Sequence, residues 1–196
     1  MNYLAHIFLS SSPPGQVGNF IGDFVKGQQM AGYPPDVQEG IRHHRAIDRF
    51  TDTHPVVQQT KVLLREPFGR YAGIILDMYF DHLLAVHFDD YSPVRLPVFA
   101  RRFYWTLWQH RRILPPAVKG IMWHFILSNR LCRYATLAGL QGSLDIMVHY
   151  KNIPIDTALA IAFLQIHYVR LEADFAAFFM EVVETEVKGL IEQERE

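Results

Sequence analysis

The chain has few cysteines and no long apolar stretch that is free of polar side chains. Its 196 residues include a single cysteine, Cys132, so no disulfide can form within the chain and we expect a reducing compartment, the cytoplasm. The most apolar runs, 73–88 and 157–169, contain Asp, His or Gln and are too short and too polar to cross a bilayer. No basic region precedes the first apolar run, so we expect no signal peptide and no membrane anchor.

Several catalytic and structural motifs are also missing. The sequence has no G-x-S-x-G motif for a serine nucleophile and no glycine-rich loop of the kind that cradles phosphates. It shows neither hairpin signals nor the alternation of apolar and polar residues that is typical of strands. These absences argue against a catalytic serine nucleophile, a glycine-rich phosphate-binding loop and a β-sheet fold.

Acidic residues are absent from the middle of the chain. Between Asp90 and Asp145 there is no Asp or Glu, so this stretch carries +8 and the rest of the chain −9, although the net charge is only −1. Such a stretch favours an anionic partner, although each arginine could also lie on an ordinary solvated helix face. The eight basic residues of this stretch are Arg95, Arg101, Arg102, Arg111, Arg112, Lys119, Arg130 and Arg133.

Apolar residues recur at helical spacing along most of the chain, and proline and glycine mark the breaks. With 49% hydrophobic residues, the composition is typical of one globular domain. The pattern predicts an all-α, single-domain helical bundle over residues 1–196. The predicted helices cover 17–27, 35–51, 55–64, 70–88, 97–113, 116–128 and 129–140, followed by a long helix, with room for a bend, that starts near Pro154 and Asp156.

Two segments combine histidine and aspartate at helical spacing. His44 and Asp48 are four residues apart and therefore share one helix face. Asp77 and Asp81 are also four apart, with His82 next to them, inside the apolar run 73–88. Buried carboxylates need compensation, and a divalent cation supplies it, so this grouping favours a metal site. Salt bridges to arginine are the alternative for either Asp alone.

Further candidates surround these segments. Asp23 is a lone acid among apolar residues near glycines and fits either a metal site or a helix cap, and we expect His6 to be a core histidine or a support for the site. Imidazole and carboxylate ligands suit Mn²⁺, Mg²⁺, iron or zinc. Arginines at positions 42, 45 and 49 follow the helix of His44 and could clamp a phosphate, or form surface ion pairs of little energy.

At these residues the sequence resembles the acyl carrier protein phosphodiesterases, or holo-ACP hydrolases. The resemblance covers roughly the first half of the chain, with the motifs in matching order. The matching stretches are Met1-Asn2-Tyr3-Leu4-Ala5-His6, Leu9-Ser10, Gly18-Asn19, Asp23-Phe24-Val25-Lys26-Gly27, Gly40-Ile41, His44-Arg45, Ile47-Asp48, Phe50-Thr51-Asp52-Thr53-His54-Pro55, Leu76-Asp77 and Asp81-His82-Leu83-Leu84.

The resemblance implies an all-helical enzyme, distantly similar to the HD-type metal phosphohydrolases. Such an enzyme uses manganese, with magnesium or another divalent ion as an alternative, to cleave 4′-phosphopantetheine from the serine of holo acyl carrier protein. The implied metal and active-site residues are Asp23, His44, Asp48, Asp77, Asp81 and His82, and the resemblance does not say which of the six bind the ion. We expect catalytic roles for Asp23, His44, Arg45, Asp48 and His82.

We expect substrate contacts from six arginines. Acyl carrier proteins are strongly acidic, so the acid-free stretch is a candidate docking surface, and we expect no nucleic-acid or membrane partner. Two other functions fit the residues: a metal-dependent phosphohydrolase acting on nucleotides, or a non-catalytic helical module binding an anionic partner. The six arginines are Arg42, Arg49, Arg101, Arg102, Arg111 and Arg112.

Overall fold

The fold is all-α, as the sequence predicts. The computed structural model describes residues 3–193, with side chains up to residue 185, and within these residues it contains 12 α-helices, three short 3₁₀ helices and no strand. The first half comprises α1 (Tyr3–Phe8), α2 (Pro13–Ile21), η1 (Gly22–Phe24), η2 (Gly27–Gly32), α3 (Pro35–Thr53), α4 (Pro55–Phe68), η3 (Gly69–Tyr71), α5 (Ala72–Val86) and α6 (Phe88–Tyr91). The second half comprises α7 (Leu96–Gln109), α8 (Pro116–Leu127), α9 (Arg130–Arg133), α10 (Leu137–Lys151), α11 (Thr157–Ile166) and α12 (Tyr168–Gln193).

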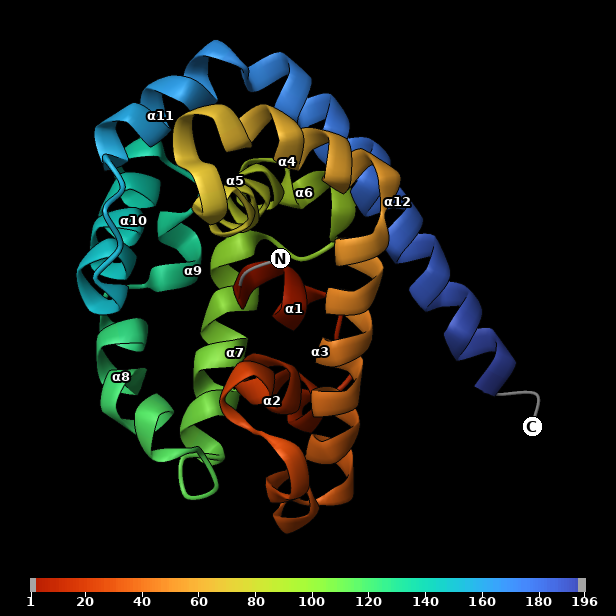
Figure 1. The fold of residues 1–196 in the computed structure, drawn as a ribbon. Helices are drawn as coiled ribbons and strands as arrows, with labels where there is room; N and C mark the ends of the chain where they lie inside the picture. Colours follow the sequence, from red (N-terminus) through yellow and green to blue (C-terminus); the bar gives the residue numbers. More distant parts are fainter. Residues whose placement is uncertain (1–2, 194–196) are drawn as a thin grey trace.

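Helix α5 forms the centre of the bundle. Eleven of its 15 residues are buried, which explains why its sequence is apolar on every side. Helices α1, α4, α10 and α12 pack against it. In Figure 1, α3 runs along one side of the molecule, α7 and α8 lie on the opposite side, and α1 and α2 lie between them.

Helices α2 and α3 pack together at backbone distance. A Cβ atom on Gly18 would lie 2.1 Å from the carbonyl oxygen of Val37, and one on Gly40 would lie 2.1 Å from that of Gly15. Only glycine fits at these two crossing points. The close packing matters for function because α3 carries His44 and Asp48.

Local signals explain where the predicted helix boundaries hold and where they are wrong. The predicted helix 35–51 is confirmed as α3, with Pro35 at its start and His54, before Pro55, at its end. The predicted helix 17–27 begins earlier, because Ser12 accepts a hydrogen bond from the Gly15 amide and caps α2.

One further predicted helix is divided in two, and the predicted long C-terminal helix is broken at a single residue, where the sequence left room for a bend. The predicted helix 129–140 is divided into α9 and α10, because Thr136 accepts a hydrogen bond from the Gly139 amide and starts a new helix that passes through Gly142. The C-terminal helix is interrupted at His167, where α11 ends and α12 follows directly. No helix within the described residues has the length and apolar character needed to span a membrane.

Candidate metal centre

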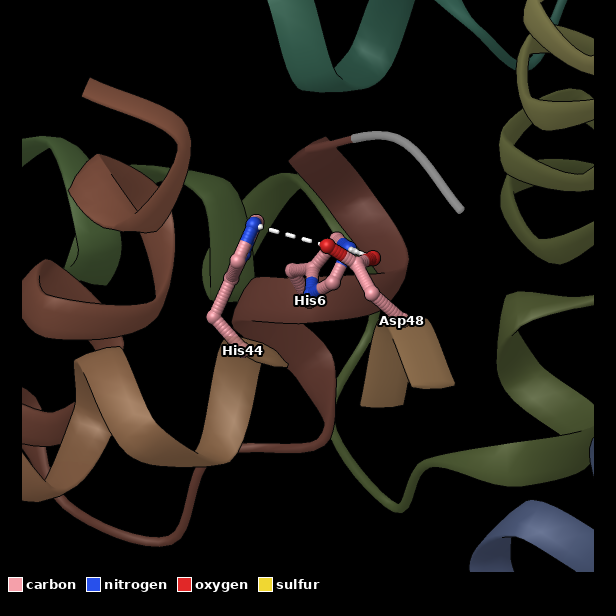
Figure 2. A group of neighbouring side chains, drawn as sticks. All are labelled: His6, His44 and Asp48. Carbon is pink, nitrogen blue, oxygen red and sulfur yellow. Dashed lines mark ion pairs between the residues drawn. The ribbon is translucent and has the colours of Figure 1, made fainter. Parts of the chain in front are cut away.

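Four side chains from three segments meet beside the N-terminal helix. Among the described residues, His6, His44 and Asp48 each offer one ligand atom, and these atoms all lie within 4.8 Å of one another. Figure 2 shows the Asp48 carboxylate between the two imidazoles, with Oδ1 3.2 Å from His6 Nε2 and Oδ2 3.2 Å from His44 Nε2. Asp23 in η1 joins the group, with its Oδ1 3.3 Å from His44 Nε2.

The cluster is closed on one side and open on the other. The side chains of His6 and His44 are only 4% and 7% exposed, whereas those of Asp48 and Asp23 are 40% and 76% exposed. The imidazoles therefore form a buried floor and the carboxylates face water. Catalytic metal sites need such an open side, because a water or substrate must reach the ion.

Hydrogen bonds around His6 fix which of its nitrogens carries the proton. The side-chain amide of Asn19 donates to Ser10 Oγ at 2.8 Å, so its oxygen faces His6 Nδ1 at 2.9 Å and accepts the Nδ1 proton. The lone pair of His6 is then on Nε2, which points to Asp48 and is buried without a hydrogen bond among the described residues. Burial lowers the pKa of His6, so the ring is neutral, the form that binds metals.

The ring of His44 occupies a space that a glycine leaves open. A Cβ atom on Gly22 would lie 2.3 Å from Cγ of His44, so no larger residue fits at that position without displacing the ring. The His44 ring also stacks on His6, with 4.1 Å between centroids. Packing therefore fixes both imidazoles in one arrangement.

The charges within the cluster depend on one another. Burial lowers the pKa of His44, but the carboxylates of Asp23 and Asp48 outweigh it and raise the value to about 9. Burial raises the pKa of Asp48, but the protonated His44 beside it holds this carboxyl well below its usual range. The hydrogen bond to His44 likewise lowers the pKa of Asp23. Without a metal, the His44 imidazolium is thus the cation that partly offsets the charge of the two carboxylates.

The residues present fit a divalent metal ion. Two imidazole nitrogens and one or two carboxylates form a mixed donor set that suits manganese, magnesium, iron or zinc. The Nε2 of His6 faces the Asp48 carboxylate without a hydrogen bond among the described residues, and this, its neutral state and the Asn19 contact behind it are the features expected of a metal-binding histidine.

The structure separates the six residues that the sequence grouped. Asp23, His44 and Asp48 come together, whereas Asp77, Asp81 and His82 are not in the group of close ligand atoms found among the described residues. Asp77 is half-buried and lines a small cavity of about 160 Å³ that Asp23 also lines. His82 is buried and donates from Nδ1 to the carbonyl oxygen of Tyr134 at 2.6 Å. A metal-binding role for these three residues stays a prediction.

Asp81 holds the helix that carries His6. It is fully buried, and its two carboxylate oxygens accept hydrogen bonds from the backbone amides of Leu4 and Ala5 at 2.8 and 3.1 Å. Burial raises its pKa to about 7. These amides belong to the first turn of α1, where they have no partner within the helix, so Asp81 caps α1 from a distance of 77 positions in the sequence.

The predicted arginines lie in different surroundings. Arg45 donates to the carbonyl oxygen of Val25 at 3.0 Å and so ties α3 to the segment after Asp23, whereas Arg42 pairs with Glu39 on the same helix. Arg111 lies 4.4 Å above the ring of Trp108. The side chains of the remaining predicted substrate contacts are exposed to solvent: Arg49, Arg101, Arg102 and Arg112.

Sequence reasoning missed the part that His6 plays. We expected a core histidine or a support, because no acidic residue lies near it at helical spacing, yet its Nε2 is one of the three clustered ligand atoms. Its partners lie on α2 and α3, and residue spacing along the sequence does not predict contacts between different helices. The one signal was its position in the first stretch that carries the family resemblance.

Comparison with known proteins places the chain in a family. Residues 1–182 match the family model described as acyl carrier protein phosphodiesterase. A protein from Photorhabdus laumondii named acyl carrier protein phosphodiesterase is 34% identical over 188 residues, which is 94% of each chain. Proteins of the same name from Yersinia pestis and Serratia proteamaculans are 33% and 32% identical, over 91% and 94% of this chain and 94% and 96% of their own.

No solved structure matches the chain, so the expected similarity to HD-type phosphohydrolases stays a prediction. The names of the relatives support neither the nucleotide phosphohydrolase nor the non-catalytic module. The family match spans both the cluster in the first 48 residues and the basic stretch that follows it. The chain belongs to the acyl carrier protein phosphodiesterase family.

Proposed function

We propose that the protein hydrolyses the phosphodiester that joins 4′-phosphopantetheine to the serine of holo acyl carrier protein. Water adds a hydroxyl to phosphorus, the bond from phosphorus to the serine oxygen breaks, and that oxygen leaves with a proton. The products are apo carrier protein and free 4′-phosphopantetheine. The names of the relatives support the substrate, and the single cysteine favours the cytoplasm as the location.

The observation that carries the chemistry is the clustering of His6, His44 and Asp48. We expect these residues, together with Asp23, to hold a divalent cation, Mn²⁺ in the first instance and Mg²⁺ as the alternative. When bound, such an ion supplies Lewis-acid chemistry, because it lowers the pKa of water and neutralises charge on phosphoryl oxygens. His44 would have to release the proton on Nε2 to hold such an ion, which would then offset the charge of the same carboxylates.

The residues of the chain then have distinct tasks. His6 presents an unprotonated Nε2 that Asn19 holds in place, and Asp48 bridges the two imidazoles. Asp23 is the most exposed of the four, so its carboxylate is placed to accept a hydrogen bond from water on the open side. Arg45 fixes the segment that carries Asp23 through the Val25 carbonyl, which makes it a positioning residue.

A mass measurement tests the reaction directly. Purified protein, Mn²⁺ and holo acyl carrier protein are incubated, and the mass of the carrier is followed with and without a chelator. We expect the carrier to lose the mass of the phosphopantetheine group only when the metal is available. A carrier that keeps its mass with Mn²⁺ and with Mg²⁺ would overturn the proposed function.

Matched substitutions on α3 test the site. Asp48→Asn removes a clustered carboxylate, whereas Asp52→Asn removes an exposed one that lies one turn further along and pairs with Lys61. We expect Asp48→Asn to abolish stoichiometric metal binding and turnover, and Asp52→Asn to retain both. Asp77→Asn decides whether that residue belongs to the ligand set, because loss of bound metal by elemental analysis would add it.

A further inference from the structure

A cavity of about 470 Å³ lies between helices α8 and α10 and has mainly apolar walls. Phe24, Ile121, Phe125 and Ile146 contribute most of its apolar side chains, and Gly120 lies in its wall on α8. We call it the arm cavity. It is well within the size range of sites that bind small organic groups.

The arm cavity adjoins the smaller cavity that Asp23 and Asp77 line. Tyr3, Arg130 and Lys151 line both, so these side chains form the boundary between the two spaces. Asp23 in turn reaches His44 at 3.3 Å. The metal centre, the small cavity and the arm cavity therefore follow one another, and Phe24 of the arm cavity is the residue next to Asp23.

The side chains that line the two cavities change from cationic at their boundary to apolar in the arm cavity. Two cationic side chains, the buried Arg130 and the exposed Lys151, lie where the cavities meet, and apolar groups line the space beyond them. Arg130 donates to the carbonyl oxygen of Ser143 at 3.1 Å, which holds the guanidinium at this boundary. A ligand with an anionic end and a long, mainly apolar body would satisfy both parts.

We propose that the arm cavity receives the pantetheine arm of the carrier protein during cleavage, with Arg130 and Lys151 at the end of the cavity that faces the phosphate and the metal centre. This assignment rests on the proposed function. The arm carries a phosphate at one end and methyl, methylene and amide groups along its length, so its chemistry follows the order of the lining. Recognition of the arm by α8 and α10 makes this cavity a specificity-determining part of the enzyme.

Gly120 provides a way to fill the arm cavity without disturbing the fold. A Cβ atom at this position meets nothing within 4 Å, and the residue lies inside α8, where a larger side chain raises helix propensity relative to glycine. Gly120→Phe therefore adds a ring to the cavity wall. Gly32→Phe is the matched control, because Gly32 also has open space around it and does not line either cavity.

Two measurements on the full chain test the proposal. Binding of free 4′-phosphopantetheine and of pantetheine is measured by calorimetry, and KM and kcat are measured with holo carrier protein. We expect Gly120→Phe to weaken the binding of both compounds and to raise KM at least tenfold, with little change in kcat and unchanged metal binding. Gly32→Phe should behave like the unmodified protein.

If the unmodified protein and Gly120→Phe bind pantetheine equally well, the arm cavity is not the site of the pantetheine arm, even if holo carrier protein is cleaved. Pantetheine binding that depends on Gly120 without any cleavage would uphold the cavity and overturn the proposed function. If Gly120→Phe fails to fold by circular dichroism, Ala117→Leu, which fills the same cavity from one turn earlier on α8, replaces it.

Discussion

Gly22 and Asn19 shape the candidate metal centre at the scale of single residues, although neither offers a ligand atom to the cluster. Gly22 leaves the space that the His44 ring fills, and Asn19 sets the proton on His6. Residues behind metal ligands commonly influence affinity and activity by about 10- to 100-fold. We therefore predict effects of that size for substitutions at both positions.

Gly22→Ala should displace the His44 ring, because its Cβ would lie 2.3 Å from Cγ of the imidazole. We expect metal affinity and turnover to fall by about 10- to 100-fold. Gly32→Ala is the control, since a Cβ at Gly32 meets nothing within 4 Å. Metal titration by calorimetry measures the effect, and unchanged affinity in Gly22→Ala would show that His44 is not held by this contact.

Asn19→Leu should free the Nδ1 of His6 from its acceptor while roughly keeping the side-chain volume. The proton can then move to Nε2, where it blocks the ligand position, so we expect about 10- to 100-fold weaker metal binding. Asn19→Asp keeps an acceptor oxygen for the Nδ1 proton and should restore much of the affinity. Rescue by Asp is the result that a merely structural role of Asn19 would not produce.

The sequence identifies some of the site residues and not others for a physical reason. His44 and Asp48 are neighbours on one helix, so their spacing alone predicts the 3.2 Å contact that the structure shows. His6 and Asn19 meet their partners only through the packing of α1 on α2 and α3. Asp81 has the same four-residue spacing from Asp77, yet it points to backbone amides of α1.

Helix α1 is the element on which the site depends most. It has only six residues, and amides of its first turn donate their hydrogen bonds to the Asp81 carboxylate of α5. Short helices have little stability of their own, so tertiary contacts must hold them. The sequence could not predict α1, because its cap lies 77 positions away, whereas Pro35 and Pro55 were enough to fix the ends of α3.

The buried carboxyl of Asp81 should make stability depend on pH. Because burial raises its pKa to about 7, the folded state keeps a proton that the unfolded state releases above about pH 4. The free energy of unfolding should therefore fall as pH rises from about 4 to 7, by up to roughly 1.4 kcal/mol per pH unit from this group.

Asp81→Asn, which resembles the protonated acid, should remove this contribution. Urea unfolding of metal-free protein is measured at pH 5 and pH 7. At each pH, the free energy of unfolding of the variant is subtracted from that of the unmodified protein. We expect this difference to decrease between the two pH values. A constant or increasing difference would mean that Asp81 is ionised throughout this range.

At the scale of the whole molecule, the acid-free stretch forms α7, α8, α9 and the first half of α10. Arg101, Trp105 and Trp108 follow one another at helical spacing on α7, and Trp105 stacks on Trp108 with 4.9 Å between centroids. Arg130 of the same stretch is buried at the arm cavity and is not part of this surface. The sequence predicts the charge of the stretch but not which of its residues reach solvent, since burial depends on packing.

Charge on this surface should control the encounter with the acidic carrier protein. We expect KM for holo carrier protein to rise several-fold as salt increases from about 50 to 300 mM, because screening weakens attraction between exposed charges. Arg101→Glu with Arg102→Glu should raise KM at low salt and reduce this salt dependence, while kcat stays near that of the unmodified protein. A KM that does not respond to salt or to charge reversal would exclude this surface as the docking surface.

The anchoring of α1 by Asp81 also determines when the site can form as the chain is made. All four clustered side chains lie within the first 48 residues, so a ribosome has synthesised every one of them early. The residue that fixes α1 lies in α5, and it emerges only after a further 33 residues, the difference between positions 81 and 48. Since long-range contacts close late, we expect His6 to join the cluster only once α5 has packed, so that any metal ion held by the cluster would bind after that step.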